Sequence, residues 1–200
     1  FQMGAILPSD AQPLGAPNVD PDTTKSEGPP HEVVLDPFFI GKYELTQGQW
    51  QRFMKENPAA YAPGRTIGGN LHDARHPVEL IGWEAATRML QRLDLVLPTE
   101  AQWEYAARGG TQSVYWTGNT KESLRGAANL SDRYCHENDG PKSWKYEEWL
   151  NDGYTVHAPV GSYRANGFGL HDMAGNVWEW VRDRQTSYSV EAQAKDGLRK

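Results

Sequence analysis

A glycine-rich run of oxygen-bearing side chains at residues 161–182 is the part of the sequence best suited to chemistry. It reads GSYRANGFGLHDMAGNVWEWVR and contains Asp172, Asn176 and Glu179. Its glycines, Gly175 among them, allow backbone conformations with positive φ and a close approach to a ligand. Calcium takes six to eight oxygen ligands, often from irregular loops. The run therefore predicts a rigid loop that binds a cation, although Asp-Gly and Gly-Asn pairs also cap ordinary turns.

Histidine spacing offers a second metal-binding pattern. His72 and His76 stand four residues apart. The further histidines are His31, His136, His157 and His171. Two histidines at this spacing bind one metal ion when a helix places both on one face. Because this pair lies beside Asp73 and Pro77 in an expected loop, we do not assign a metal site to it.

The chain has one cysteine, Cys135, which excludes an internal disulfide framework. Thiolates are the ligands that suit Cu(I), but a single thiol cannot form a two-thiolate site. We therefore interpret Cys135 as an incidental thiol.

Two tryptophans near the end of the glycine-rich run allow two interpretations. Trp178 and Trp180 alternate with Val177, Glu179 and Val181, which predicts one face of a short strand. Core packing is the interpretation we favour, and a stacking surface for a peptide or glycan is the alternative.

Glutamates of an expected helix are interpreted as surface charges. They are Glu100 and Glu104. Glu104 also has the spacing to hold Arg108, four residues further on.

Three helices are expected to position these residues. Capping-box spacings after Thr46 and Thr99 predict helix starts, and Gly109 predicts the end of the third helix. The first helix should cover residues 47–56, and apolar periodicity predicts the second at 83–93.

The rest of the chain is expected to hold short strands and loops. Short strands are expected at residues 1–4, 32–35 and 38–41, the last two separated by Asp36-Pro37. Long or irregular segments are expected at residues 5–30, 57–75 and 111–159, and residues 184–200 are expected to be mobile.

Composition limits the class of protein. The 200 residues suit one domain, and 8 Trp, 9 Tyr and 5 Phe must supply much of the core because hydrophobic residues make up only 38%. The net charge of −6, without a basic cluster, argues against nucleic-acid binding. No apolar run approaches the roughly 20 residues of a transmembrane helix. The compartment is not identified, and an extracytoplasmic one, periplasmic or secreted, is slightly favoured.

Five blocks of the sequence, in order, resemble the sulfatase-modifying-factor family, also called the formylglycine-generating enzyme (FGE-sulfatase) family. They are residues 31–42 (HEVVLDPFFIGK), 43–50 (YELTQGQW), 76–78 (HPV), 97–110 (LPTEAQWEYAARGG) and 158–180. The resemblance implies a mixed α/β (α+β) fold of the C-type-lectin-like type, with little regular secondary structure and about three helices packed on small antiparallel sheets. It implies a single domain over residues 1–200, which lacks the family's C-terminal block and could be completed by a partner segment.

The resemblance also implies two structural calcium sites. The matching ligand positions of the first site are Asn129, Leu130, Asp152 and Tyr154, and those of the second are Asp172, Gly175, Val177 and Glu179. Asp172 replaces the family's frequent Asn and adds a negative charge. With these positions matched, we expect at least one bound calcium ion in place of simple turn capping.

Three functions follow from the resemblance. The first is a calcium-stabilised binding or structural domain, which we favour, with a peptide or protein as its ligand. The second is an O₂-dependent oxidase that converts a sulfatase cysteine to formylglycine with Cu(I). Its two catalytic cysteines would lie beyond Lys200, so no catalytic residue is assigned here. The third is an oxidase that tailors a different peptide or metabolite.

Overall fold

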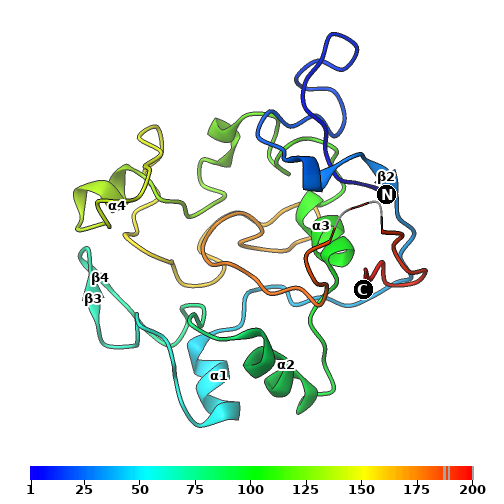
Figure 1. Ribbon diagram of the computed structural model, residues 1–200. Helices are drawn as coiled ribbons and strands as arrows, with labels where there is room; N and C mark the ends of the chain where they lie inside the picture. Colours follow the sequence, from blue (N-terminus) through cyan, green and yellow to red (C-terminus); the bar gives the residue numbers. More distant parts are fainter. Residues whose placement is uncertain (187, 189, 200) are drawn as a thin grey trace.

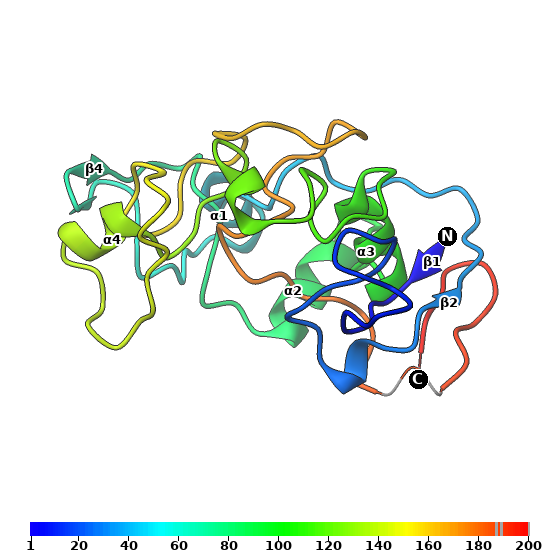
Figure 2. The same cartoon turned by 90° about the horizontal axis from the view of Figure 1, so that it is seen from above.

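The computed structural model describes residues 1–186, 188 and 190–199. Four short α-helices lie in the described part of the chain, and most of the remainder is loop (Figure 1). The termini lie at one end of an elongated molecule (Figure 2). Helix α4 (Arg133–Glu137) and strands β3 (Thr66–Ile67) and β4 (Asn70–Leu71) lie at the other end. Segment 160–180, orange in Figure 1, runs through the middle between these ends. The mixed α/β architecture with small antiparallel sheets is confirmed.

The capping boxes set the starts of two helices as predicted. Helix α1 covers Gln47–Met54, and the Thr46 side chain accepts a hydrogen bond from the Gln49 backbone N–H. Helix α3 covers Glu100–Arg108, where Thr99 does the same for Gln102. Gly109 ends α3 in the left-handed conformation, as expected of a helix C-cap.

Helix α2 covers Trp83–Gln91, close to its predicted range. It packs on α1 rather than on a sheet. Trp50 of α1 and Met89 of α2 form a buried cluster with Val78. Among the described elements, the second helix therefore packs only on another helix. Of the described helices, only α3 packs against a strand, which is β1 (Gln2–Met3).

Both sheets are short. Strand β1 (Gln2–Met3) pairs antiparallel with β2 (His31–Glu32), and Met3 faces His31 in this register. Strand β3 (Thr66–Ile67) pairs antiparallel with β4 (Asn70–Leu71) in a hairpin. The expected strand at residues 38–41 is wrong. Residues 38–41 pair with no described strand, and Pro37 just before them has no N–H to donate to a ladder.

The loop-rich middle of the chain contains a helix that the sequence analysis missed. Helix α4 covers Arg133–Glu137, and the Asp132 side chain caps it by accepting from the Cys135 N–H. Its five residues are too few to show helical periodicity in the sequence. Short 3₁₀ turns, η1 and η2, occur at Lys25–Glu27 and Lys121–Leu124.

Glu104 is not the surface charge that we expected. Its Oε1 accepts hydrogen bonds from Arg108 Nε and from the Gly4 backbone N–H, each at 2.8 Å. Arg108 in turn donates to the Gly4 carbonyl at 3.0 Å. The pair with the predicted i, i+4 spacing therefore fastens α3 to the chain just after β1.

The described residues of the segment after residue 184 return to the end of the molecule that holds both termini. Leu35 bridges to Lys195, and the Arg199 backbone N–H donates to Asp183 Oδ1 at 2.7 Å. Residues 187, 189 and 200 lie outside the described part. The mobility expected for residues 184–200 stays a prediction.

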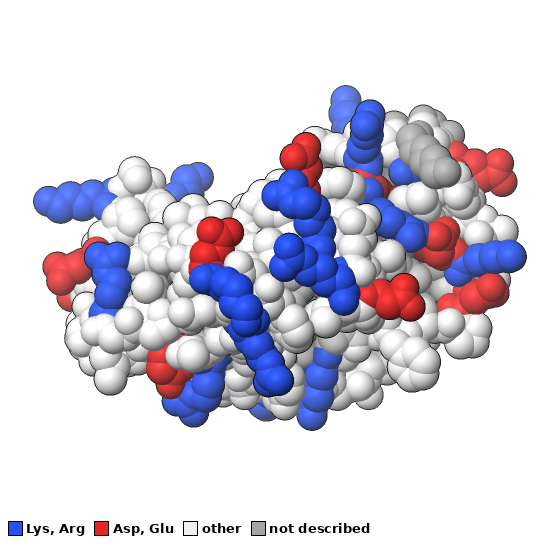
Figure 3. Space-filling view, turned by 90° about the horizontal axis from the view of Figure 1, so that it is seen from below, with Lys and Arg blue, Asp and Glu red and all other residues white. Residues whose placement is uncertain are grey.

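The surface carries both signs of charge. Lys and Arg side chains are interspersed with Asp and Glu over the face in Figure 3. Among the described residues no helix is long and apolar enough to cross a membrane.

Candidate metal and ligand-binding sites

The loop around the second predicted calcium site is bent by left-handed residues. Asp172, Gly175 and Asn176 have φ of 59°, 81° and 63°. Positive φ is uncommon outside glycine, and Asn and Asp adopt it most readily. Residues 172–176 therefore follow the tight path that their sequence predicts, in the middle of the fold.

Asp172 offers one carboxylate oxygen without a partner. Its Oδ2 accepts the Gly161 backbone N–H at 2.6 Å. Its Oδ1 is buried and has no hydrogen-bond partner among the described residues, and the residue as a whole is 3% exposed. Burial raises the pKa of this carboxyl. A buried, unpartnered oxygen costs free energy unless a ligand satisfies it, so Asp172 fits a cation ligand.

Glu44 is a third acidic residue at this place, and the sequence analysis missed it. Its Oε2 accepts a hydrogen bond from Asn176 Nδ2 at 2.6 Å, and its buried Oε1 has no partner among the described residues. Burial raises the pKa of Glu44 to about 9, with the nearby carboxylates of Glu179 and Asp172 adding to the rise. Glu44 precedes α1 within the block of residues 43–50, and only the fold shows that it meets Asn176.

Glu179 completes the group of carboxylates. Its Oε2 accepts from Trp103 Nε1 of α3 at 2.8 Å. The residue keeps accessible surface, but the surrounding protein still raises the pKa of its carboxyl. Three carboxyls that disfavour one another's ionisation are what a divalent cation would stabilise.

The tryptophans on either side of Glu179 are not core residues, so the interpretation we favoured was wrong. Trp178 is 102% exposed and Trp180 is 49% exposed. The described chain forms no strand there. Trp180 Nε1 donates to the Ile81 carbonyl at 2.9 Å. The residues alternate as in a strand, but no described strand covers them, so the Trp178 ring is exposed. Its exposure is compatible with the alternative interpretation, a stacking surface for a peptide or glycan.

The residues of the first predicted calcium site also come together. Asp152 accepts the Leu130 N–H on Oδ2 at 2.8 Å and the Tyr154 N–H on Oδ1 at 2.9 Å. Asn129 Nδ2 donates to the Val156 carbonyl at 3.0 Å. Burial raises the pKa of Asp152 to about 7. Here the carboxylate bonds to the backbone, so this site lacks the unpartnered oxygens of the second one.

The two predicted calcium sites touch each other. Asn129 of the first forms a parallel bridge with Gly175 of the second. The Asn176 backbone N–H donates to the Asn129 carbonyl at 2.9 Å. Any ion that orders one segment therefore supports the other.

A cleft of about 620 Å³ lies over both segments. Leu130 and Gly175 contribute to its wall. Its aromatic lining comes from Trp103, Tyr115, Trp116 and Trp149, and its charged lining includes Glu104, Arg108, Lys121 and Glu147. Lys121 Nζ pairs with Glu147 Oε2 at 2.6 Å at the edge of this cleft. Such a mixture of aromatic rings and a few paired charges is typical of a ligand site.

Cys135 does not offer a copper site. It is buried in α4, and burial raises the pKa of its thiol. The chain has no second cysteine to pair with it. The residues present therefore do not fit a two-thiolate Cu(I) centre.

The two histidines of the pair lie side by side without the helix that the sequence analysis required. His72 and His76 lie outside any helix, yet their rings stack with centroids 4.2 Å apart. His157, from a segment distant in the sequence, joins them. A turn at residues 73–75 brings the pair together without the helix that we required.

Comparisons with known proteins identify the family. The pattern of the sulfatase-modifying factor enzyme 1-like domain (FGE-sulfatase) matches residues 6–198. The formylglycine-generating enzyme of Thermomonospora curvata is 30% identical over 88% of this chain and 70% of its own length. That of Mycobacterium tuberculosis is 40% identical over 54% of this chain and a 33% share of its own length.

A solved structure agrees with the family. PvdO from Pseudomonas aeruginosa superposes with a TM-score of 0.68 and 26% identity, covering 100% of this chain and 72% of that one. The ordered sequence blocks, the loop-rich fold and these relatives agree. The chain belongs to the sulfatase-modifying factor enzyme 1-like (FGE-sulfatase) domain family.

Proposed function

We propose that this chain is a calcium-stabilised peptide-binding domain of the family. The observation that carries the proposal is the aromatic cleft whose wall includes Leu130 and Gly175, one residue from each predicted calcium site. In this proposal the ions order the loops, and the loops hold the cleft open for its ligand.

Calcium would be held by residues already described. At the second site the side-chain ligands would be Asp172 and Glu179 with the carbonyls of Gly175 and Val177. Glu44, whose pKa is raised by burial and by both of those carboxylates, would add a third carboxylate. At the first site Asp152 and Asn129 would turn from their present backbone partners, with the carbonyls of Leu130 and Tyr154. When bound, the ion supplies positive charge that offsets carboxylate repulsion, and it stabilises the folded state by linkage.

The cleft would bind peptide by stacking and by paired charges. Trp116 and Trp149 offer aromatic faces, and each lies under an arginine: Arg164 is 5.6 Å from the Trp116 ring and Arg125 is 5.2 Å from the Trp149 ring. These contacts hold the rings in place before a ligand arrives. An arginine side chain of a peptide could exchange with the Lys121 end of its pair with Glu147.

A direct test is binding of a peptide with the Cys-x-Pro-x-Arg pattern, followed by tryptophan fluorescence and calorimetry. We expect binding that weakens in Trp149→Ala and after calcium removal, and that persists in Trp144→Ala, an exposed tryptophan that does not line the cleft. Equal affinity in wild type and Trp149→Ala would refute the cleft as the binding site.

A second candidate is the formylglycine-generating oxidase, which the names of the two bacterial relatives favour. This activity would need two thiolates from outside these 200 residues, because Cys135 alone cannot supply them. Thiol counting on the protein as it is made in its own organism, with oxygen consumption on the same peptide, separates this candidate from simple binding. Oxygen uptake with peptide conversion would establish the oxidase.

A further inference from the structure

Three buried histidine side chains lie close together in loops, outside the helices and strands. They are His72, His76 and His157, and one ring nitrogen of each lies within 4.8 Å of the other two. The His157 ring centroid is 5.1 Å from that of His72 and 5.3 Å from that of His76. The rings therefore surround one small volume.

Four of their six ring nitrogens have no hydrogen-bond partner in the described part of the chain. His72 is 1% exposed, His76 1% and His157 4%. Among the described residues, His72 Nδ1, His76 Nε2 and both nitrogens of His157 have no hydrogen-bond partner. A buried polar atom left without a partner destabilises the folded state. Each neutral imidazole has one lone-pair nitrogen, so the three rings bring three lone pairs to one place, which calls for a ligand that accepts them.

We propose that His72, His76 and His157 bind a divalent transition-metal ion such as zinc. Imidazole suits zinc, whereas calcium and magnesium require oxygen ligands. Three histidines and one open position are a known zinc ligand set. This site is distinct in residues and in ligand chemistry from the two predicted calcium sites.

Burial shifts the pKa values of the three rings in one direction. Burial, with the nearby His72 and His76, lowers the pKa of His157 to about 3. Burial, with the nearby His76, lowers the pKa of His72 to about 4. Burial likewise lowers the pKa of His76. For all three rings the direction of the shift favours the neutral imidazole, which is the form that binds a metal ion.

Asp73 orients His76. Its carboxylate Oδ1 lies 3.3 Å from His76 Nδ1, and its backbone carbonyl lies 3.2 Å from the same nitrogen. With its proton on Nδ1, His76 donates to Asp73 and aims the lone pair of Nε2 at the cluster. Metal-binding histidines are commonly held by a carboxylate or carbonyl in this way. With its proton on Nε2 instead, His76 would accept the Asp73 backbone N–H on Nδ1 at 3.1 Å. The Nε2 proton would then have no acceptor among the described residues, which favours the tautomer with the proton on Nδ1.

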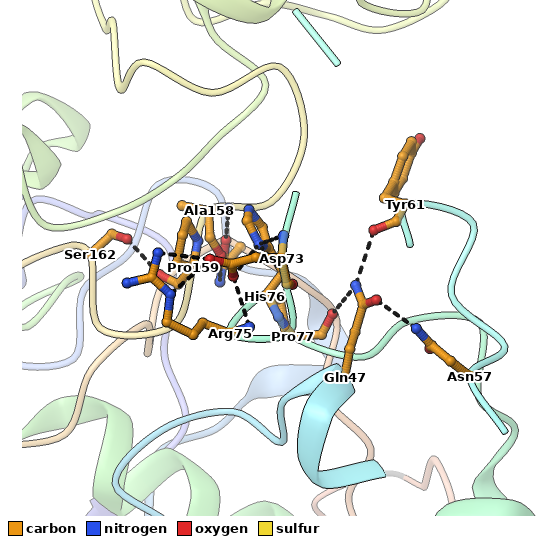
Figure 4. A network of polar contacts seen from close by, with 11 residues as sticks. Gln47, Asn57, Tyr61, Asp73, Arg75, His76, Pro77, Ala158, Pro159 and Ser162 are labelled. Atoms are coloured by element: carbon orange, nitrogen blue, oxygen red, sulfur yellow. Dashed lines mark hydrogen bonds and ion pairs between the residues drawn. The ribbon is translucent and has the colours of Figure 1, made fainter. Parts of the chain in front are cut away.

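A polar network fixes the backbone around the cluster (Figure 4). Buried Gln47, the first residue of α1, donates from Nε2 to the carbonyls of Tyr61 and Pro77 at 3.1 and 3.2 Å. Asn57 Nδ2 donates to Gln47 Oε1 at 2.8 Å. The Gln47 backbone N–H donates to the His76 carbonyl at 2.9 Å. These bonds hold His76 on one side and the Tyr61 segment on the other.

The second segment is tied to the first near His157. Asn70 Nδ2 donates to the Gly153 carbonyl at 2.8 Å, and the Val160 N–H donates to the Arg75 carbonyl at 3.1 Å. The Tyr61 ring packs edge-on to His157 with centroids 5.5 Å apart. The site is therefore preformed between residues 57–78 and 153–160, and a metal ion would crosslink them.

Only a small movement is needed for coordination. Zinc lies about 2.0–2.1 Å from imidazole nitrogen, so tetrahedral ligand nitrogens are roughly 3.4 Å apart. Ring rotations can draw the three nitrogens together from within 4.8 Å. Tyr61 lies next to two of the rings.

The experiment titrates Zn²⁺ into the full chain after removal of metals and saturation with calcium. Calcium occupies its own sites first, so zinc binding and the proposed calcium function fail independently. We expect one zinc per chain by calorimetry and metal analysis, with a rise in Tm. Co²⁺ should give the visible absorption of a tetrahedral, nitrogen-ligated ion, and zinc should abolish it.

Variants identify the ligands. His157→Asn and His76→Asn should each lose stoichiometric zinc binding, whereas His136→Asn, an exposed histidine outside the cluster, should keep it. Asp73→Ala should weaken zinc binding by about 10–100-fold, because it removes the carboxylate that orients His76. Asp10→Ala, at an exposed position, is its matched control and should bind zinc as wild type does.

The proposal is overturned if wild type binds no zinc at the level of one ion per chain, or if His157→Asn binds it unchanged. Should a histidine variant fail to fold, the Co²⁺ spectrum of the wild-type protein decides. A spectrum unchanged from that of hydrated Co²⁺ would reject the site.

Discussion

Gly175 lies against the backbone of Asn129 so closely that a Cβ atom at position 175 would come within 1.9 Å of the Asn129 carbonyl oxygen. The same carbonyl accepts the Asn176 N–H. The contact joins the two predicted calcium sites, and it also sets the wall of the cleft, where Gly175 and Leu130 are neighbours. A side chain at this position would push the two segments apart.

Gly175→Ala should therefore destabilise the protein severely, by more than about 4 kcal/mol, because the clash adds to the cost of a left-handed alanine. Urea unfolding monitored by circular dichroism measures it. Gly169→Ala is the matched control: Gly169 has a similar φ of 79° but open space around its Cα. We expect that variant to lose only about 1–2 kcal/mol. Equal losses would show that the contact with Asn129 is unimportant.

Calcium should stabilise the protein. At a concentration of 100 times its Kd, one bound ion adds about 2.7 kcal/mol, or roughly 5–10 °C in Tm for a chain of this size. Thermal unfolding of metal-free protein with added Ca²⁺ measures this rise. Asp172→Asn or Glu179→Gln should remove part of it, and Asp152→Asn another part.

The control for the calcium prediction is Glu84→Gln, since the Glu84 side chain is 87% exposed on α2. Its response to calcium should match wild type. A Tm that does not change with calcium in the wild-type protein would argue against both sites.

Metal-free protein should lose stability between pH 7 and 9 because of Glu44. Its pKa is about 9 in the folded state against 4.5 as the ordinary value, so the stability it provides is complete below pH 4.5 and is lost as pH rises through 9. Below pH 7 the lowered pKa values of His72 and His157 act in the opposite direction. The range from 7 to 9 is therefore the one to measure.

Urea midpoints across that range provide the test. Glu44→Gln should flatten the decline, and Glu84→Gln should leave it unchanged. Calcium should reverse it, because an ion favours the ionised carboxylates, and its affinity should rise with pH. A decline of the same slope in Glu44→Gln would assign it to another group.

Gln47→Ala should cost about 2–5 kcal/mol, because Gln47 is fully buried and its loss leaves two carbonyls and the Asn57 amide without a partner. Gln51→Ala on the exposed side of the same helix should change stability by no more than about 0.5 kcal/mol. Chemical denaturation of both variants makes the comparison. Similar small losses would mean that the network in Figure 4 contributes little.

Local signals in the sequence predicted local structure well. Thr46 and Thr99 predict the starts of α1 and α3 because a capping box involves only four consecutive residues. Gly109 predicts the end of α3 because a left-handed C-cap is equally local. The oxygen ligands predicted for the first calcium site come from two short segments, residues 129–130 and 152–154, and those for the second from one, residues 172–179. Their spacing could therefore be matched to the family before any fold was known.

Contacts between distant segments could not be predicted. Glu44 meets Asn176 across 132 residues, and no local pattern marks such a pair. His76 reaches His157 only through the fold, and a turn gave His72 and His76 the proximity that we had required of a helix. Trp178 alternates like a strand residue, but no neighbouring strand covers it, so its ring is on the surface.

The reactivity of the buried Cys135 thiol should report local opening of the folded protein. The side chain is 0% exposed, and a Cβ at Gly140 would lie 2.7 Å from its sulfur, so the 135–140 turn closes over the atom that a labelling reagent must reach. Modification then has to wait for the segment to open. These 200 residues contain no second thiol that would also react. The rate of Cys135 labelling therefore measures local opening of the segment near Asp132 and Asp152. A ligand or ion that stabilises this region should lower that rate.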